Sequence, residues 1–326
     1  MTKRWACPIS AALLVLGGLV RAPADAQDYP ARRMTIVVPY TAGSGFDTVA
    51  RTVGQKIAER WGQPVVVDNK AGASGTIGAE AVAQAAPDGY TLLMTGAPHT
   101  VSAALSKSLR FDPVAGFTAL GNVGTSGLAL VINPAVFPVN SLLEFVAYAK
   151  VRPGQLNHSS PGLGTLQHLG MELFKQQLGL DALHVPYRGA APALTDLLTG
   201  QVHFTFLPVH SARPHVQEGK LRMLAVASAK RSAFAPEVPT LTELGYPTVD
   251  FELWYGFFGP ANLPAAIVAK WERELDAIAT LPDVKDGLER QGMAPVFWDA
   301  ATTGARVRTE VVRWRQVVEK AGIKAE

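Results

Sequence analysis

Short apolar runs alternate with helical patterns through the first hundred residues of the chain. The runs at 36–38, 64–68 and 91–94 are rich in valine, isoleucine and leucine, as is typical of strands buried on both faces of a sheet. Apolar residues with helical spacing follow the first two runs, at 49–57 and 79–86. This alternation across short loops predicts a parallel, doubly wound sheet. The ligands of such a sheet bind at the edge where the loops after consecutive strands meet.

The same alternation begins again after an apolar run at 128–132, which we interpret as a strand that crosses into a second lobe. A later apolar run, at 221–227, is predicted to cross back. We therefore predict one lobe made of residues 27–126 and 227–326 and another made of residues 127–226. Two lobes joined by two crossing strands enclose a cleft, and closure about such a hinge is a common way to hold a small ligand.

Residues 1–26 have the three parts of a secretory signal peptide. Lys3 and Arg4 form a positive start, Ile9–Val20 is apolar, and Ala24-Asp-Ala26 fits a cleavage site of small residues. The apolar run is shorter than the ~20 residues that a membrane-spanning helix needs. We expect cleavage near Ala26 and export of the remaining 300 residues. A buried N-terminal helix is the alternative interpretation.

Cysteine and charge content narrow the class of protein further. Cys7 is the only cysteine and lies in the leader, so the exported chain depends on its core and not on disulfides. Lys3, Arg4, Arg21 and Asp25 also leave with the leader, which lowers the formal net charge from +3 to +1. A chain so close to neutral has no electrostatic reason to bind nucleic acid or a membrane surface.

The stretch from Met34 to Asp47 is the clearest candidate binding element. Pro39 ends the first apolar run because it has no N–H to donate to a sheet, and the small residues 42–45 follow. Asp47 stands where a helix N-cap is expected. A strand, a glycine loop and a helix start present free N–H groups and a positive dipole end to an anion. We predict one half of a carboxylate site here, although a plain glycine turn would have the same composition.

Six motifs carry a resemblance to a known family. They occur in the family's order and close to its spacing, at Pro39–Asp47, Asn69–Gly78, Pro87–Tyr90, His184–Gly189, Ala193–Val202 and Gly219–Val226. The chain resembles the Bug-type periplasmic solute-binding proteins, which are the receptors of tripartite tricarboxylate transporters. The match covers essentially the whole chain after the leader.

The resemblance implies an α/β, two-lobed Venus-flytrap fold of the type II-like kind, in which each lobe is a mainly parallel sheet flanked by helices. It further implies a periplasmic monomer that binds a small organic carboxylate between two opposed loops. The implied partner is a transporter with two membrane components. The resemblance implies no cofactor and no metal.

The resemblance and the loop chemistry together give a set of candidate ligand contacts. The first-lobe loop spans 41–47, the second-lobe loop lies around 159–165, and 187–189 forms a wall beside it. The complete set is Tyr40, Thr41, Ala42, Gly43, Ser44, Gly45, Phe46, Asp47, Ser74, Ser159, Ser160, Gly164, Thr165, His168, Tyr187, Arg188, Gly189 and Leu207.

Several of these residues have a second interpretation. Asp47 suits a helix cap better than a ligand contact, because a bare carboxylate repels an anionic guest. Arg188 could pair with a ligand carboxylate or stay solvated, and His168 could simply pack behind the loop. The serine and threonine hydroxyls could serve either role. Trp254 and Tyr255, in an aromatic run, are expected in the core.

Two departures from the family pattern concern the ligand. Where the family often has aspartates after its Gly-Gln-Val motif, this chain has His203 and Leu207. Phe46 is a bulky aromatic residue in the first loop, where smaller residues are common. We expect an amine-free di- or tricarboxylate, or an aromatic carboxylate such as a phthalate-type acid.

Two other functions are consistent with the residues. An exported hydrolase could use Ser44 or Ser159 with His158 or His168, although no G-x-S-x-G elbow surrounds Ser44. A sensor subunit that presents its ligand to a membrane kinase is the other alternative. P-loop, dinucleotide-binding and H-E-x-x-H signatures are absent from the sequence.

Overall fold

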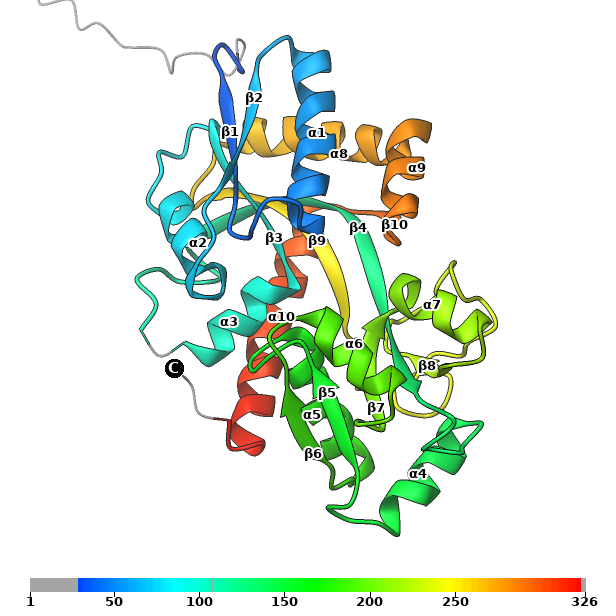
Figure 1. The fold of residues 1–326 in the computed structure, drawn as a ribbon. Helices are drawn as coiled ribbons and strands as arrows, with labels where there is room; N and C mark the ends of the chain where they lie inside the picture. The colour runs from blue at the N-terminus through cyan, green and yellow to red at the C-terminus, as the bar shows by residue number, and fades with distance from the viewer. Residues whose placement is uncertain (1–28, 107, 324–326) are drawn as a thin grey trace, which may run out of the picture.

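A ten-stranded mixed sheet runs through the described part of the molecule, residues 29–106 and 108–323 of the computed structural model (Figure 1). The predicted leader, 1–26, lies outside these residues. The strands are β1 (Met34–Val38), β2 (Val65–Asn69), β3 (Thr91–Gly96), β4 (Phe117–Ile132), β5 (Asn157–Ser160), β6 (Leu183–Pro186), β7 (Phe204–Pro208), β8 (Arg222–Val226), β9 (Glu252–Pro260) and β10 (Ala294–Trp298).

Helices cover both faces of this sheet. They are α1 (Gly45–Trp61), α2 (Thr76–Ala83), α3 (Ala97–Leu105), α4 (Leu142–Lys150), α5 (Leu166–Leu178), α6 (Ala190–Leu198), α7 (Val209–Gln217), α8 (Ala265–Thr280), α9 (Pro282–Arg290) and α10 (Ala300–Lys320), with a short 3-10 helix, η1, at Ala73–Gly75. Among the helices described, none combines the length and the apolar content needed to cross a membrane.

Two parallel groups of strands form the predicted doubly wound sheets. In the first lobe β1 pairs in parallel with β2 and β3, and in the second lobe β5 pairs in parallel with β6 and β7. The sheet as a whole is mixed and not mainly parallel, because β4, β8, β9 and β10 add antiparallel pairs between the two groups. From the sequence we assigned no strand at β9 or β10.

Strand β4 belongs to both lobes. Its residues 117–127 pair with β9 and its residues 128–132 pair with β7 and β8, so the strand changes partners at a single point. Figure 1 shows β4 and β9 linking the two halves of the molecule. We expected the return crossing at 221–227. There β8 pairs with residues 129–132 of β4, and Glu252 at the start of β9 pairs with Gly127. The three predicted lobe ranges stay predictions.

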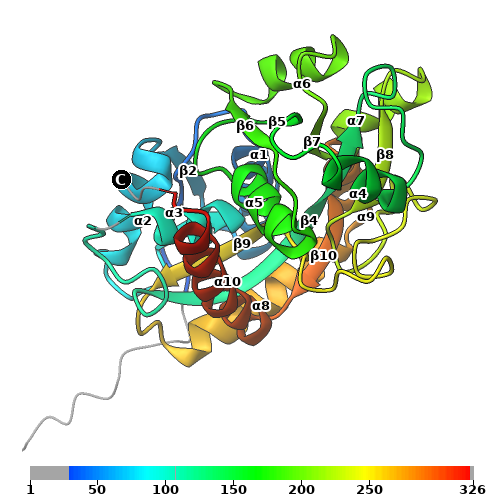
Figure 2. The same cartoon turned by 90° about the horizontal axis from the view of Figure 1, so that it is seen from below.

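One apolar core spans both lobes on one side of the sheet, where α3 and α10 lie next to α5 (Figures 1 and 2). On the opposite side each lobe has a separate core, under α1 and α8 in the first lobe and under α6 and α7 in the second. The lobes are therefore joined by continuous packing on one face of the sheet only. Trp254 and Tyr255 are buried in these cores, as the sequence predicted.

Helix α10 is fixed by one buried carboxylate. Glu310 accepts hydrogen bonds from Thr100 Oγ1 of α3 at 2.8 Å, Trp254 Nε1 of β9 at 3.2 Å and Arg306 Nε at 2.6 Å. Buried charges are tolerated when they are paired and fully hydrogen-bonded. The helix begins at Ala300, because Asp299 caps it by accepting the Thr302 N–H at 2.6 Å.

We expect Gly96→Ala to destabilise the protein by about 3 kcal/mol or more. A Cβ at Gly96 would lie 1.7 Å from the backbone oxygen of Trp254, so the β3–β9 pairing would have to shift. The matched control is Gly287→Ala in α9, where the nearest atom lies 3.9 Å away. That change should stabilise by about 0.5–1 kcal/mol. Urea unfolding measures both, and equal effects would contradict the close packing of β3 and β9.

Candidate functional site

The first-lobe loop is built around a helix cap that differs from the predicted one. Ser44, not Asp47, caps α1, and its Oγ accepts the Asp47 N–H at 3.3 Å. The Asp47 carboxylate reaches back to accept the Gly43 N–H at 2.9 Å. This is a variant of the capping box: the cap side chain accepts the N–H of the third helical residue, and that residue accepts the N–H of Gly43, one residue before the cap. The sequence contained its Ser-x-x-Asp spacing, but we assigned the cap to the wrong end of it.

The Asp47 carboxylate is fully engaged within the protein. Besides Gly43, it accepts hydrogen bonds from Arg51 Nε and from Asn69 Nδ2, each at 3.0 Å. Burial by itself would raise the pKa of this carboxyl group, but the hydrogen bonds from Arg51, Gly43 and Asn69 together lower it below its usual value. Asp47 therefore holds the loop in shape as a permanent anion and has no free oxygen edge for a ligand.

The outer part of the first loop is open to solvent. Thr41, Ala42 and Gly43 are exposed, and Ser44 and Gly45 are half-buried. Ser44 accepts the Asp47 and Thr48 N–H groups, so the N–H groups of Gly45 and Phe46 are those of the first turn of α1 that are left for an anion. The Ser44 Oγ accepts a helix N–H, which leaves its own hydrogen free to be donated outward.

Phe46 does not project into this open loop as we expected. Its ring is buried between the rings of Tyr40 and Tyr255, with centroids 4.5 and 4.8 Å away. The Tyr40 hydroxyl in turn shares a hydrogen bond with Thr95 Oγ1 at 3.0 Å. These aromatic side chains support the loop from behind, so Phe46 gives no reason to favour an aromatic ligand.

Ser74 sits on a strained turn beside the first loop. Ala73 and Ser74 both have left-handed backbone conformations, with φ of 45° and 55°. Gly75, which follows, lies against the Tyr40 ring, and Asn69 Nδ2 donates to the Tyr40 carbonyl at 3.2 Å. Such conformations in residues other than glycine cost about 1–3 kcal/mol each and concentrate at functional sites. The turn and the first loop form one connected surface of the first lobe.

The second-lobe loop is held by its own hydroxyl groups. Thr165 caps α5, accepting the His168 N–H at 3.3 Å and donating to the Gly162 carbonyl at 2.8 Å. Ser159 and Ser160 lie at the end of β5 and are buried, whereas we expected them on the loop surface. Ser160 Oγ is 2.7 Å from His184 Nε2 and 3.0 Å from the Gly162 carbonyl. Both serines thus lie beneath the loop, because they belong to β5, whose last residue is Ser160.

Three histidine rings stack under this loop. His168 and His184 lie 4.0 Å apart between centroids with an interplanar angle of 12°, and His184 and His158 lie 5.0 Å apart at 18°. His168 Nδ1 accepts the Gly164 N–H at 3.1 Å, which fixes the loop. Burial lowers the pKa of all three, to about 4 for His168 and about 3 for His184. At neutral pH the stack is therefore uncharged. His184 was quoted in a motif but was not predicted as part of the site.

The adjacent wall is a turn that leads into α6. Gly189 precedes α6 with φ of 121° and donates its N–H to the Pro161 carbonyl at 2.9 Å, which ties the wall to the second loop. The Tyr187 hydroxyl donates to Asp196 of α6 at 2.5 Å, so the Tyr187 side chain faces that helix. Arg188 is exposed and has no ion-pair partner among the residues that the structure describes.

Leu207 lies in the core and not at the edge of a cleft. It is 3% exposed on β7, pairs with Ala129 of β4, and packs with Val131 and Val209. Successive side chains of a strand point to opposite faces, and Leu207 lies on the face of β7 that α7 covers. We therefore do not carry Leu207 into the proposed site.

A cavity of about 550 Å³ lies between the two lobes. The first lobe contributes Ser74 and the end of α3, and the second contributes Gly164 and His168. Residues 40–47 and 187–189, although described, do not line this cavity. The structure thus joins Ser74 to the second-lobe loop, while the first loop stands beside Ser74 at the same sheet edge. The volume of the cavity is within the range of small-molecule sites.

Two lobes that share one strand and present helix-capping loops at the carboxyl ends of their parallel strands define a solute-binding receptor fold. Comparison with known proteins identifies the family of the chain. The model of the Tripartite tricarboxylate transporter family receptor matches residues 49–323. This chain belongs to that family, as its motifs predicted.

Relatives and solved structures agree with this assignment. Protein BugT of Bordetella pertussis is 35% identical over 307 residues, covering 94% of each chain. The structure of R. palustris Rpa4515 with adipate is 32% identical, with a TM-score of 0.74, and covers 91% of this chain and 99% of that one. The structure of MatC (Rpa3494) from Rhodopseudomonas palustris with bound malate is also 32% identical, with a TM-score of 0.70, and covers 89% and 100%.

We expect His168→Asn to flatten the pH dependence of stability. The pKa of His168 falls from 6.5 in the unfolded chain to about 4 in the folded protein, so the unfolded state binds more protons between these values. His168 therefore contributes stability that is complete above pH 6.5 and is lost as the pH falls toward 4. The asparagine Oδ1 can accept the Gly164 N–H in place of Nδ1 but does not titrate.

Urea unfolding between pH 4 and 7 measures this difference. The free energy of unfolding should fall less steeply with acidification in His168→Asn than in the wild type. An NMR titration that placed the pKa of His168 at 6 or above would contradict the buried, uncharged stack.

Proposed function

We propose that this protein is a periplasmic receptor that binds an amine-free di- or tricarboxylate between its lobes and delivers it to a tripartite tricarboxylate-type membrane transporter. The observation that supports the proposal is that each lobe has a helix-capping loop at the end of a parallel strand, before α1 and before α5. Backbone N–H groups and hydroxyls at such loops are suited to carboxylate oxygens.

The charges at the loops favour an acid over an amino acid. Asp47 is the one acidic residue among the predicted contacts, and its oxygens are used by Gly43, Arg51 and Asn69. A ligand ammonium group would therefore find no free carboxylate there. Arg188 is the exposed cation at the wall and can hold a second carboxylate. Adipate and malate, seen with two related proteins, are both amine-free dicarboxylates.

The hydrolase alternative has less support from the geometry. Ser44 serves as the cap of α1, and Ser159 is buried with no hydrogen-bond partner for its Oγ within the described residues. The serine and histidine that do meet are Ser160 and His184, and Ser160 is fully buried. A nucleophile must reach its substrate, so we propose a receptor and not an enzyme.

Calorimetry with adipate, malate, citrate and phthalate, against aspartate and glutamate, tests the ligand class. We expect at least one of the four acids to bind and both amino acids to fail. A bound acid at 100 times its Kd should raise the free energy of unfolding by ~2.7 kcal/mol. Tight binding of aspartate or glutamate, with none of the acids bound, would contradict the proposal.

Arg188→Gln should weaken the binding of a dicarboxylate about tenfold or more, because a charge-assisted hydrogen bond to the second carboxylate is lost. The control is Arg33→Gln. Arg33 is also exposed, but it precedes β1 and so lies at the strand end away from the loops. Equal affinities for both variants would remove Arg188 from the site.

Ser44→Ala separates ligand contact from helix capping. Loss of the cap should cost about 1 kcal/mol of stability, and loss of the outward hydroxyl should weaken acid binding about tenfold. Ser141→Ala removes an equivalent cap from α4, where Ser141 Oγ accepts the Glu144 N–H at 3.2 Å, and should leave binding unchanged. Ester turnover by the wild type that disappears in Ser44→Ala would instead establish the hydrolase.

A further inference from the structure

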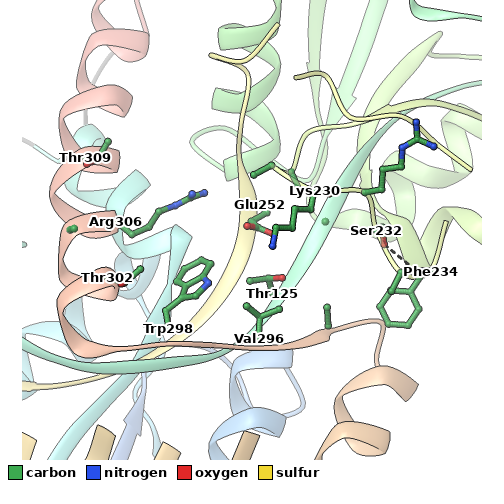
Figure 3. Close-up of a pocket in the computed structure, with 17 residues that line it drawn as sticks. Thr125, Lys230, Ser232, Phe234, Glu252, Val296, Trp298, Thr302, Arg306 and Thr309 are labelled. Atoms are coloured by element: carbon green, nitrogen blue, oxygen red, sulfur yellow. Dashed lines mark hydrogen bonds between the residues drawn. The ribbon is translucent and has the colours of Figure 1, made fainter. Parts of the chain in front are cut away.

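A second cavity, of about 610 Å³, lies against the crossing strands and is separate from the loops described above. It is enclosed by β4, β9, β10, the first half of α10 and the segment 228–234 (Figure 3). The residues predicted to contact the carboxylate between the lobes do not line it.

The first loop and the second cavity lie on opposite faces of β9. Tyr255 packs against Phe46 of the first loop, whereas its neighbour Trp254 donates to Glu310 of α10. Successive side chains of a strand point to opposite faces. Glu252, which lines the second cavity, therefore shares the Trp254 face and faces away from the first loop.

The cavity has an apolar body with a few charged groups at one end. Trp298, Val296 and Phe234 supply aromatic and aliphatic surface, and several alanines complete it. Figure 3 shows Arg306 reaching in from α10 and Lys230 from the opposite side, with Glu252 between them. Mainly apolar lining with a few convergent polar groups is characteristic of small-molecule sites.

The cationic side chains of the cavity are not fully paired. Lys230 has no ion-pair partner within residues 29–106 and 108–323. Arg306 bonds Glu310 through Nε and pairs with Asp250 through Nη1 at 3.6 Å, and its Nη2 is buried without a hydrogen-bond partner in the same part of the chain. A buried guanidinium nitrogen with no acceptor is costly, so the Arg306 side chain gains if it turns toward an anion in the cavity.

We propose that this cavity is a second binding site, for an amphipathic carboxylate whose aromatic or alkyl body lies against Trp298 and whose carboxylate lies between Lys230 and Arg306. The lining comes from the crossing strands and from elements on both sides of them. Any change in the angle between the lobes therefore changes the shape of the cavity. Occupancy is coupled to ligand binding between the lobes, and the coupling is reciprocal.

The protonation of Glu252 gives the site a pH dependence that can be tested independently. Burial raises the pKa of Glu252 to about 7, while Arg306 acts to lower it and Asp250 and Glu310 to raise it. Glu252 is therefore largely neutral below pH 7 and becomes an anion above it. Because an anionic Glu252 repels a ligand carboxylate, affinity for a carboxylate should fall as the pH rises through 7 and should lose this dependence in Glu252→Gln.

The experiment uses 4-phenylbutyrate as the probe and its neutral amide as the chemical control, with binding measured by calorimetry on the full protein. We expect saturable binding of the acid and at least tenfold weaker binding of the amide. Lys230→Gln should weaken binding of the acid about tenfold. Ala305→Phe fills the cavity from an exposed helical position, and it should abolish binding.

Matched variants separate this site from the one between the lobes. Ala301→Phe, one turn earlier on α10 and outside the cavity lining, should leave probe binding unchanged, as should Arg188→Gln. No saturable binding at millimolar probe would overturn the proposal. So would binding that survives Ala305→Phe or binding that Arg188→Gln abolishes, which would place the probe between the lobes. These outcomes do not depend on whether adipate or malate binds.

Discussion

The structure depends on one strand that is shared by both lobes. The backbone groups of β4 are paired with β9 up to Gly127 and with β7 and β8 from Leu128 onward. Each lobe completes its sheet with part of the same strand, so neither sheet is complete without it. Buried backbone groups must be paired, and this requirement fixes where the two lobes can meet.

The sharing of β4 explains the distribution of the core. Helices α3, α5 and α10 bury one continuous apolar cluster across the junction, while the clusters under α1 and under α6 remain separate. The joined side resists separation because it would expose apolar surface. The side with separate cores has no such restraint, and the first loop and the wall before α6 belong to these helices. Fixed packing on one side and independent packing on the other is the arrangement a hinged receptor needs.

The sequence predicted the parts of this fold that have strong local signals. The parallel strands, their glycine loops and most of the helices follow from apolar periodicity and turn residues, and the family followed from ordered motifs. Strands β9 and β10 were missed because their pairing is with β4, more than a hundred residues away in the chain. The place where the chain returns to the first lobe stays a prediction, since nothing local distinguishes the β8 run from a crossing strand.

The sequence predicted which loops form the candidate site, but not which of their residues support the loops from beneath. The first loop, the turn at Ser74 and the loop before α5 were all named from the sequence. However, Ser160, Phe46 and Asp47 support these loops from beneath, and Leu207 lies in a core. Which side of a loop a residue faces is decided by tertiary contacts such as the Tyr40–Phe46–Tyr255 packing and the histidine stack. A spacing pattern does not contain that information.

The point where β4 changes partners has a mechanical consequence. Rotation there needs only small changes in the backbone torsions near Gly127 and Leu128, while the hydrogen-bond ladders above and below it stay whole. The strand therefore acts as a torsion spring, in which strain is spread over a few dihedral angles and no bond has to break. Such a change of angle would leave the sheets of both lobes intact.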